Sequence, residues 1–365
     1  MSATGVAHYT PEWLALREAA DEAARAVELL DPLREFLARP GGGKPLVIRD
    51  LGCGTGSMGR WLAPRLDGPQ HWILHDHDPG LLALAAGQLP RTAADGGAVT
   101  VATEHGDIAR LTAAGLRGTS LVTASALLDL LTREELDGLV ATCAGAGCPA
   151  LLALSVLGRV DLTPADPMDA EIADAFNAHQ RRADRGRGLL GPDAVAAASV
   201  AFARHGMTVR AQSSPWRLGP VDRVGPTGTS EAAATGEAGS GPCGCGSGPC
   251  GCEAGDGAAA EHGRATTGGA SRTRRARREE PQLCVPGLAS AEGPGRRAPG
   301  PASSALTEQW LRGWVGAARE QRPELASRAD AYLRRRLAAC EAGELRVVVH
   351  HSDVLALPRP AGRTP

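Results

Sequence analysis

The sequence predicts an α/β protein with a Rossmann-like, doubly wound sheet of seven strands, mostly parallel with an antiparallel last strand, and a helical cover. Three observations support this fold class. Short apolar runs alternate with helical patterns between residues 46 and 213. A glycine-rich turn joins the first run to a helix in VIRDLGCGTGSMGRWLA, residues 47–63. Helices at both ends complete the pattern, and alternation of this kind places helices on both faces of a parallel sheet.

The composition is that of a globular chain and points to no charged partner. Of 365 residues, 43% are hydrophobic but only 3% are aromatic, so aliphatic side chains must fill the core. A formal net charge of -2 gives no reason to expect a nucleic acid or an anionic membrane as partner. The sequence contains neither an apolar run of ~18 residues nor a signal-peptide pattern near its start. We therefore expect a cytoplasmic protein with reduced cysteines and no membrane partner.

The elements follow from periodicity. Residues 11–38 carry apolar side chains at helical spacing behind Thr10 and Pro11, which predicts an N-terminal helical cover. Strands are predicted at 46–50, 71–76, 98–103, 119–124, 149–156 and 207–213. Helices are predicted between them at 57–65, 79–88, 108–114, 132–145, 168–184 and 192–205.

A change of composition divides the chain. Residues 222–303 are rich in Gly, Ala, Ser, Pro, Thr and Arg, which predicts a disordered low-complexity insertion after a core of residues 1–221. It contains C-x-C-x4-C-x-C (Cys243, Cys245, Cys250 and Cys252), either a thiolate metal site or a chance expansion of the tract. Residues 304–358 then predict two amphipathic cap helices and a last, antiparallel edge strand at 345–358 that completes the sheet.

The glycine turn is predicted to hold a cationic nucleoside rather than a dinucleotide. Gly54, Gly56 and Gly59 fit the G-x-G-x-x-G pattern, which alone is weak. Asp50, however, ends the preceding strand beside the turn. A carboxylate there would repel a pyrophosphate and attract an ammonium or sulfonium group.

DLGCGTG, residues 50–56, resembles motif I of class I S-adenosylmethionine (SAM)-dependent methyltransferases. The resemblance covers about residues 46–213 and the last strand, and it implies SAM as cofactor. It implies that Asp50, Gly52, Gly54 and Gly56 form the cofactor turn and that Asp76 accepts the ribose hydroxyls. It also implies that Asp107 binds the adenine amino group with Ile108 beside it, and that Ser125 lines the methyl-transfer pocket. His77 departs from the pattern, because the family often has an apolar residue against adenine at this position, where an imidazole could stack instead. The family's N/D-P-P-Y/F signature of amino methylation on nucleobases or glutamine is absent.

The methyl acceptor is expected after the fifth strand. There, residues 161–194 carry many hydrogen-bonding side chains at the sheet edge where ligands gather in open α/β folds. His179 is the candidate general base because an unperturbed imidazole titrates near neutral pH, and Asp129 is the alternative. An ordinary solvated helix face is the competing interpretation. Trp310 and Trp314 are either core or an acceptor-stacking platform.

The expected function is methyl transfer from SAM to oxygen or nitrogen of a small-molecule acceptor by in-line displacement. Two alternatives stay open. A protein or RNA methyltransferase would use the arginine-bearing insertion for recruitment, and a non-catalytic module would bind SAM without transfer. The His-rich stretch HWILHDHD, residues 71–78, also raises a metal site, but alternation along a strand puts its groups on different faces, and we predict none.

Overall fold

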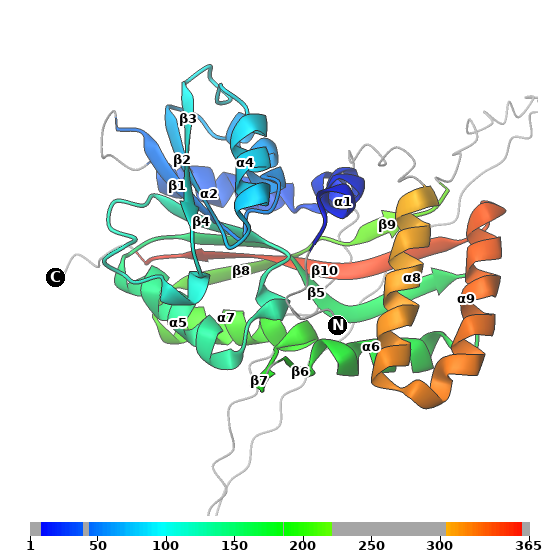
Figure 1. Ribbon diagram of the computed structural model, residues 1–365. Coiled ribbons are helices and arrows are strands. Elements are labelled where there is room, and N and C mark those ends of the chain that lie inside the picture. Colours follow the sequence, from blue (N-terminus) through cyan, green and yellow to red (C-terminus); the bar gives the residue numbers. More distant parts are fainter. Residues whose placement is uncertain (1–8, 39–43, 185, 221–303, 360–365) are drawn as a thin grey trace, which may run out of the picture. The chain divides into compact units, whose positions relative to one another are not determined.

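The chain is organised around a mixed sheet of eight strands in the order β3-β2-β1-β4-β5-β10-β8, with β9 also paired to β10 (Figure 1). The computed structural model describes residues 9–38, 44–184, 186–220 and 304–359, all within one of the two units into which the chain divides. The insertion predicted at 222–303, with its four cysteines, lies outside the described residues. The strands are β1 (Leu46–Leu51), β2 (Gln70–Asp76), β3 (Val99–His105), β4 (Leu121–Ser125), β5 (Ala150–Thr163), β8 (Thr208–Ser213), β9 (Trp216–Leu218) and β10 (Arg346–Leu357).

The doubly wound arrangement is confirmed, but the sheet has eight strands rather than the predicted seven, because β9 also pairs with β10. Strands β1 to β5 pair in parallel, with β1 between β2 and β4, so the direction of winding reverses between β1 and β4. Ligands in open α/β sheets bind at such a reversal, outside the carboxyl ends of the strands. A cavity lined by Asp50, Asp76 and Ser125, from the ends of β1, β2 and β4, lies there.

The last strand is antiparallel, as predicted, but its predicted place at the edge was wrong. β10 pairs with β5 on one side and with β8 on the other, so β8 forms the edge. Residues 351–356 of β10 are all buried. The backbone N–H and C=O groups of a buried strand need hydrogen-bond partners at both edges, and β5 and β8 supply them to β10.

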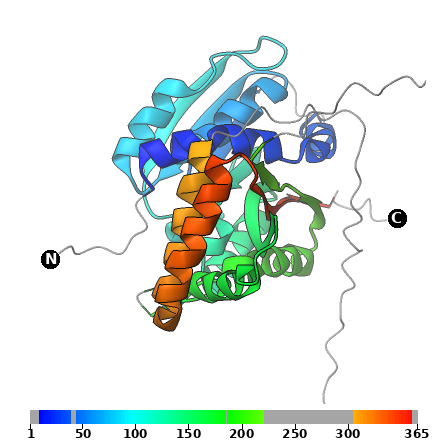
Figure 2. The ribbon, with the colours of Figure 1, turned by 90° about the vertical axis from the view of Figure 1, so that its right-hand side faces the viewer.

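Helices cover both faces of the sheet, and α8 and α9 run side by side next to α6 (Figures 1 and 2). They are α1 (Pro11–Ala24), α2 (Leu30–Leu37), α3 (Ser57–Leu62), α4 (Pro79–Gln88), α5 (Arg133–Gly145), α6 (Asp169–Gln180), α7 (Ala194–Arg204), α8 (Ser304–Gln321) and α9 (Ala326–Glu341). Short 3-10 turns are η1 (Val27–Leu29), η2 (Ala63–Arg65), η3 (Ile108–Arg110), η4 (Leu128–Leu130), η5 (Gly191–Asp193) and η6 (Pro323–Leu325). A search of the described helices finds none with the length and apolar content to cross a membrane.

Three predicted helices needed correction. The predicted 108–114 helix is only η3, because residues 109–119 offer a single buried apolar side chain, Leu116. The predicted 168–184 helix ends at Gln180 and continues into a short hairpin of β6 (Ala183–Asp184) and β7 (Arg187–Gly188). The predicted 11–38 cover is broken after Ala24.

The break after α1 has a distant cause. Asp353 on β10 is 1% exposed, and its carboxylate accepts the backbone N–H of Ala26 at 2.8 Å and that of Leu154 on β5 at 2.7 Å. Arg25 is turned inward and is also 1% exposed. An N–H taken by a carboxylate cannot continue the helix, so the chain changes direction here and α2 starts at Leu30.

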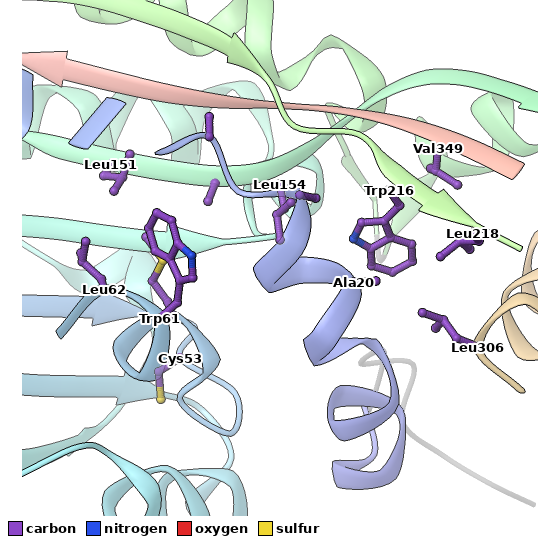
Figure 3. Close-up of a cluster of buried hydrophobic side chains, with 14 of the residues drawn as sticks. Ala20, Cys53, Trp61, Leu62, Leu151, Leu154, Trp216, Leu218, Leu306 and Val349 are labelled. Atoms are coloured by element: carbon purple, nitrogen blue, oxygen red, sulfur yellow. The ribbon is translucent and has the colours of Figure 1, made fainter. Parts of the chain in front are cut away.

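The core has one layer on each face of the sheet. Along β5, Leu151 and Ala153 belong to the layer beneath α1 to α4, and Leu152 belongs to the layer beneath α5 and α7. Figure 3 shows part of the first layer, in which Trp216 of β9 lies beside Ala20 of α1. The Trp216 indole N–H also donates to Asp21 at 2.9 Å. This contact fixes α1 over the sheet.

Candidate functional site: two adjoining cavities at the carboxyl ends of the strands

The turn between β1 and α3 depends on glycine. Gly52, Gly54 and Gly56 have φ of +60°, +53° and +85°, the left-handed region that L side chains rarely adopt. At Gly56 a Cβ would also stand 3.0 Å from Leu89 and 3.2 Å from Ala85. The close approach of α4 therefore excludes larger residues there. The Gly54 N–H donates to the Asp76 carboxylate at 2.9 Å, which ties the turn to β2.

A cavity of about 300 Å³ lies against this turn. It brings together most of the residues that the sequence predicts for the cofactor: Asp50, Gly52, Gly54, Asp76, His77 and Ser125. Gly56 shapes the turn without lining the cavity. Leu14, Arg17 and Asp21 of α1 form another part of the wall. The sequence predicts α1 as a cover but gives no signal that these three side chains line the site, because their position depends on the packing of α1 against β9.

Asp50 is the most perturbed acid of this cavity. It is 1% exposed, and one carboxylate oxygen accepts the Thr123 hydroxyl at 2.7 Å. The other oxygen, Oδ2, has no hydrogen-bond partner among the described residues. Burial raises the pKa of Asp50 to about 7, while the Thr123 hydrogen bond and the charge of Arg25 oppose that rise. A buried carboxylate with a free oxygen favours a cationic or hydrogen-bond-donating partner.

Asp76 closes the other side of the turn. It is 4% exposed, and besides the Gly54 N–H it accepts the N–H of Asp78 at 3.0 Å. A carboxylate has about four lone-pair directions, so two remain for a ligand. The next side chain, His77, is 58% exposed with Nδ1 3.3 Å from the Asp76 carboxylate. An exposed imidazole beside the cavity has room to lie over a ring, as the sequence predicts.

Asp107 and Ile108 are placed elsewhere. Asp107 accepts the N–H of Ala109 and begins η3. It lines a separate cavity of about 290 Å³ with His75 and Glu104, and neither Asp107 nor Ile108 lines the cavity at the glycine turn. Neither residue thus lies in the wall of the cavity at the glycine turn, and their contact with adenine stays a prediction.

A larger cavity, of about 580 Å³, adjoins the first one. The two share four wall residues, Tyr9, Leu130, Arg182 and Leu189. Both candidate bases, Asp129 and His179, line only the larger cavity. A ligand in the smaller cavity and one in the larger would thus both contact these four residues and lie next to each other.

The environment separates the two candidate bases chemically. Burial and the nearby charge of Arg182 lower the pKa of His179, so its imidazole is neutral at pH 7 and able to accept a proton. Burial raises the pKa of Asp129. Asp129 thus holds a proton more readily than an exposed carboxyl, and in that form it donates one hydrogen bond through its O–H and accepts others through its carbonyl oxygen.

The polar stretch after β5 is used unevenly. Phe176, His179 and Gln180 of α6 line the larger cavity. Asn177 instead donates to the carbonyl of Gly158 at 2.7 Å, and Arg181 pairs with Asp193 at 2.6 Å. The helix therefore has a cavity face and a structural face. Within the part of the chain that the structure describes, no group of three or more His, Cys, Asp or Glu side chains is placed to hold a metal ion.

Comparison with known proteins yields structural likeness alone. No family model and no curated protein matches the sequence. The chain resembles magnesium protoporphyrin IX methyltransferase from Synechocystis PCC 6803 with bound SAH, at 15% identity over 58% of this chain and 84% of that one, with a TM-score of 0.33. It also resembles a cyclopropane synthase from Mycobacterium tuberculosis, at 10% identity over 90% of this chain and 83% of that one, with a TM-score of 0.35. A third similar structure is a SAM-dependent methyltransferase from Methanosarcina mazei, at 13% identity over 47% of this chain and 85% of that one, with a TM-score of 0.33.

Proposed function

We propose that this chain is a SAM-dependent methyltransferase that transfers a methyl group to an oxygen or nitrogen atom of a small-molecule acceptor. The observation that carries the proposal is the buried Asp50 carboxylate, whose Oδ2 lacks a hydrogen-bond partner among the described residues, in a cavity at the glycine turn. An ammonium group would satisfy that oxygen, whereas a diphosphate would be repelled by Asp50 and Asp76 together.

The rest of the smaller cavity fits the same ligand. Asp76 has acceptor capacity left for vicinal hydroxyls, and His77 offers a ring face. Arg17, held by a hydrogen-bonded ion pair with Asp21 at 2.9 Å, supplies a positive charge for a carboxylate. A zwitterionic amino acid joined to a nucleoside combines these groups, and the proposed cofactor has that chemistry.

When bound, SAM would supply an activated methyl group on a sulfonium. The protein's own task is then to align an acceptor and to exclude water. Leu130 and Leu189 in the shared wall are apolar and suit the second requirement. His179 would remove a proton from a hydroxyl or protonated amine acceptor, because its lowered pKa keeps the imidazole neutral.

Calorimetry with S-adenosylhomocysteine (SAH) tests the cofactor assignment. We expect Asp76→Ala to abolish measurable binding, since the variant loses both the ribose acceptor and the tie to Gly54. Asp76→Asn keeps one acceptor oxygen for that tie and should still bind poorly. Asp67→Ala, an exposed carboxylate outside the cavity, is the matched control. Unchanged affinity in both Asp76 variants, or NADH binding where SAH does not, would refute the assignment.

A deletion separates the alternative functions. Removing residues 225–300 should leave turnover of a small molecule intact, whereas a protein or RNA methyltransferase that recruits through the insertion should lose substrate affinity.

A metabolite screen with labelled SAM tests the alternative that the chain is a non-catalytic SAM-binding module. In that case SAH binds normally, yet no acceptor in the screen becomes labelled.

A further inference from the structure

The larger cavity holds a concentration of aromatic side chains that the composition does not predict. The chain has eleven aromatic residues among 365, and five of them line this cavity: Tyr9, Trp13, Phe176, Trp310 and Trp314. They come from α1 and the residue before its cap, from α6 and from α8, which are distant in sequence. Core packing in this protein is otherwise mainly aliphatic. Aromatic residues gathered at a cavity point to a ligand with a ring.

Two of these rings form a platform. The Trp310 and Trp314 indoles are stacked, with centroids 5.1 Å apart and planes 17° from parallel. Trp314 is buried at 2% exposure and packs at a tilt against Tyr332, with centroids 6.3 Å apart. Trp310 is half-buried. The inner indole thus anchors the outer one, and the outer one lines the cavity. The sequence left open whether this pair is core or platform, and the positions indicate that Trp314 is core and Trp310 is platform.

Three residues of the same cavity carry polar atoms with unmet hydrogen-bonding capacity. Asp129 Oδ1 and Gln180 Oε1 are buried acceptors, and Trp314 Nε1 is a buried donor. None of the three has a partner in the described part of the chain. Buried polar groups in native proteins are nearly always paired, so unpaired ones that share a cavity indicate the polarity of what binds there. Two acceptors and one donor favour a ligand with N–H groups beside an acceptor atom.

We propose that the larger cavity is the acceptor site and that the acceptor is a planar heteroaromatic ring bearing N–H donors, stacked on Trp310 and hydrogen-bonded to Asp129 and Gln180. This inference rests on the proposed function. In the transfer, the carbon–sulfur bond breaks and its electron pair stays on sulfur, which becomes a neutral thioether. A new bond forms from the methyl carbon to a ring-borne nitrogen or oxygen, and any proton on that atom passes to the His179 imidazole.

Ring probes test the site independently of turnover. With SAH present, we would titrate aminobenzimidazole and guanine by tryptophan fluorescence and saturation-transfer NMR. Indane has the flat bicyclic outline without N–H donors, and cyclohexanecarboxamidine has N–H donors without an aromatic ring. The planar heterocycles should bind about tenfold tighter than either control, because only they combine stacking with hydrogen bonding.

Variants identify the contacts. Trp310→Leu should weaken binding of the heterocycles about tenfold, while Trp310→Phe, which keeps a ring, should restore most of it. Asp129→Ala should weaken binding by a similar factor. Leu333→Ala on α9 and Asp137→Asn on α5 are the matched controls, since neither residue lines the cavity, and both should bind like the parent protein.

The two proposals fail differently. Equal binding of all probes, no binding of the heterocycles to a protein that still binds SAH, or Trp310→Leu behaving like Leu333→Ala would overturn the ring-acceptor inference alone. Loss of SAH binding by the parent protein would instead overturn the proposed function. Heterocycles that compete with SAH for the smaller cavity, and bind nowhere else, would also count against the larger cavity as the acceptor site.

Discussion

Asp50 should make the affinity for the cofactor depend on pH, and the variant Asp50→Asn should lose that dependence. With a folded-state pKa of about 7, only about 1% of Asp50 is ionised at pH 5 and about half at pH 7. If the ligand's ammonium group requires the carboxylate, the apparent dissociation constant is the intrinsic one divided by the ionised fraction. SAH affinity should therefore rise about fiftyfold between pH 5 and pH 7.

The free protein should respond in the opposite direction. Folding raises the pKa of Asp50 from 3.8 to about 7, so the folded state holds this proton more tightly than the unfolded state. Its contribution to the free energy of unfolding is present below pH 4 and is lost as pH rises through 7. The loss is on the order of a few kcal/mol. Asp50→Asn retains an acceptor for Thr123 without an ionisable group, so the variant should show neither effect.

Calorimetry of SAH binding at half-unit steps from pH 5 to pH 7, with urea unfolding in the same buffers, measures both quantities. His77 also lines the cavity, so His77→Gln serves as the control for imidazole titration. A flat affinity profile in the parent protein would refute the ammonium–carboxylate pairing. An equally steep profile in Asp50→Asn would assign the pH dependence to another group.

Three further outcomes follow from specific contacts. Gly56→Ala should lower the free energy of unfolding by about 2–3 kcal/mol in urea melts, more than Gly68→Ala, which has a similar φ of +82° but open space around it; equal losses would show that crowding by Leu89 is unimportant. Asp353→Ala should lower the free energy of unfolding by about 3–5 kcal/mol, because it leaves two buried N–H groups without an acceptor and removes one of the three carboxylates near the buried Arg25; a loss within the range of an exposed Asp161→Ala would contradict this. His179→Ala should slow turnover of a hydroxyl acceptor about 100-fold or more with SAH affinity unchanged, while the exposed His205→Ala keeps the parent rate; full activity would remove His179 from proton transfer.

The part of the site next to the glycine turn could be predicted because its signals are local. Asp50, the turn glycines and Asp76 occupy one strand–turn–helix–strand segment, and parallel pairing of β1 with β2 carries Asp76 to the same edge. Asp107 shows the limit of this reasoning. Its carboxylate caps η3 and does not line the cavity at the glycine turn, so its contact with adenine stays a prediction.

The acceptor side could not be predicted in the same way. The sequence marked His179, Asp129 and the Trp310–Trp314 pair as candidates, but nothing in the spacing joins Trp13 to Trp310 across almost 300 residues. Their meeting depends on how α1, α6 and α8 pack, and α1 is itself positioned by Trp216 and by the Asp353 carboxylate.

Sequence by itself determined the order of strands and helices, the glycine turn and the carboxylates that flank it, because side-chain period, left-handed glycine and strand ends are properties of a few consecutive residues. Only the tertiary structure decided that β10 lies inside the sheet, that α1 breaks after Ala24, and that five aromatic side chains enclose one cavity. Each of these results from pairing or packing between segments far apart along the chain, where the energetic preference belongs to the pair and to neither segment alone.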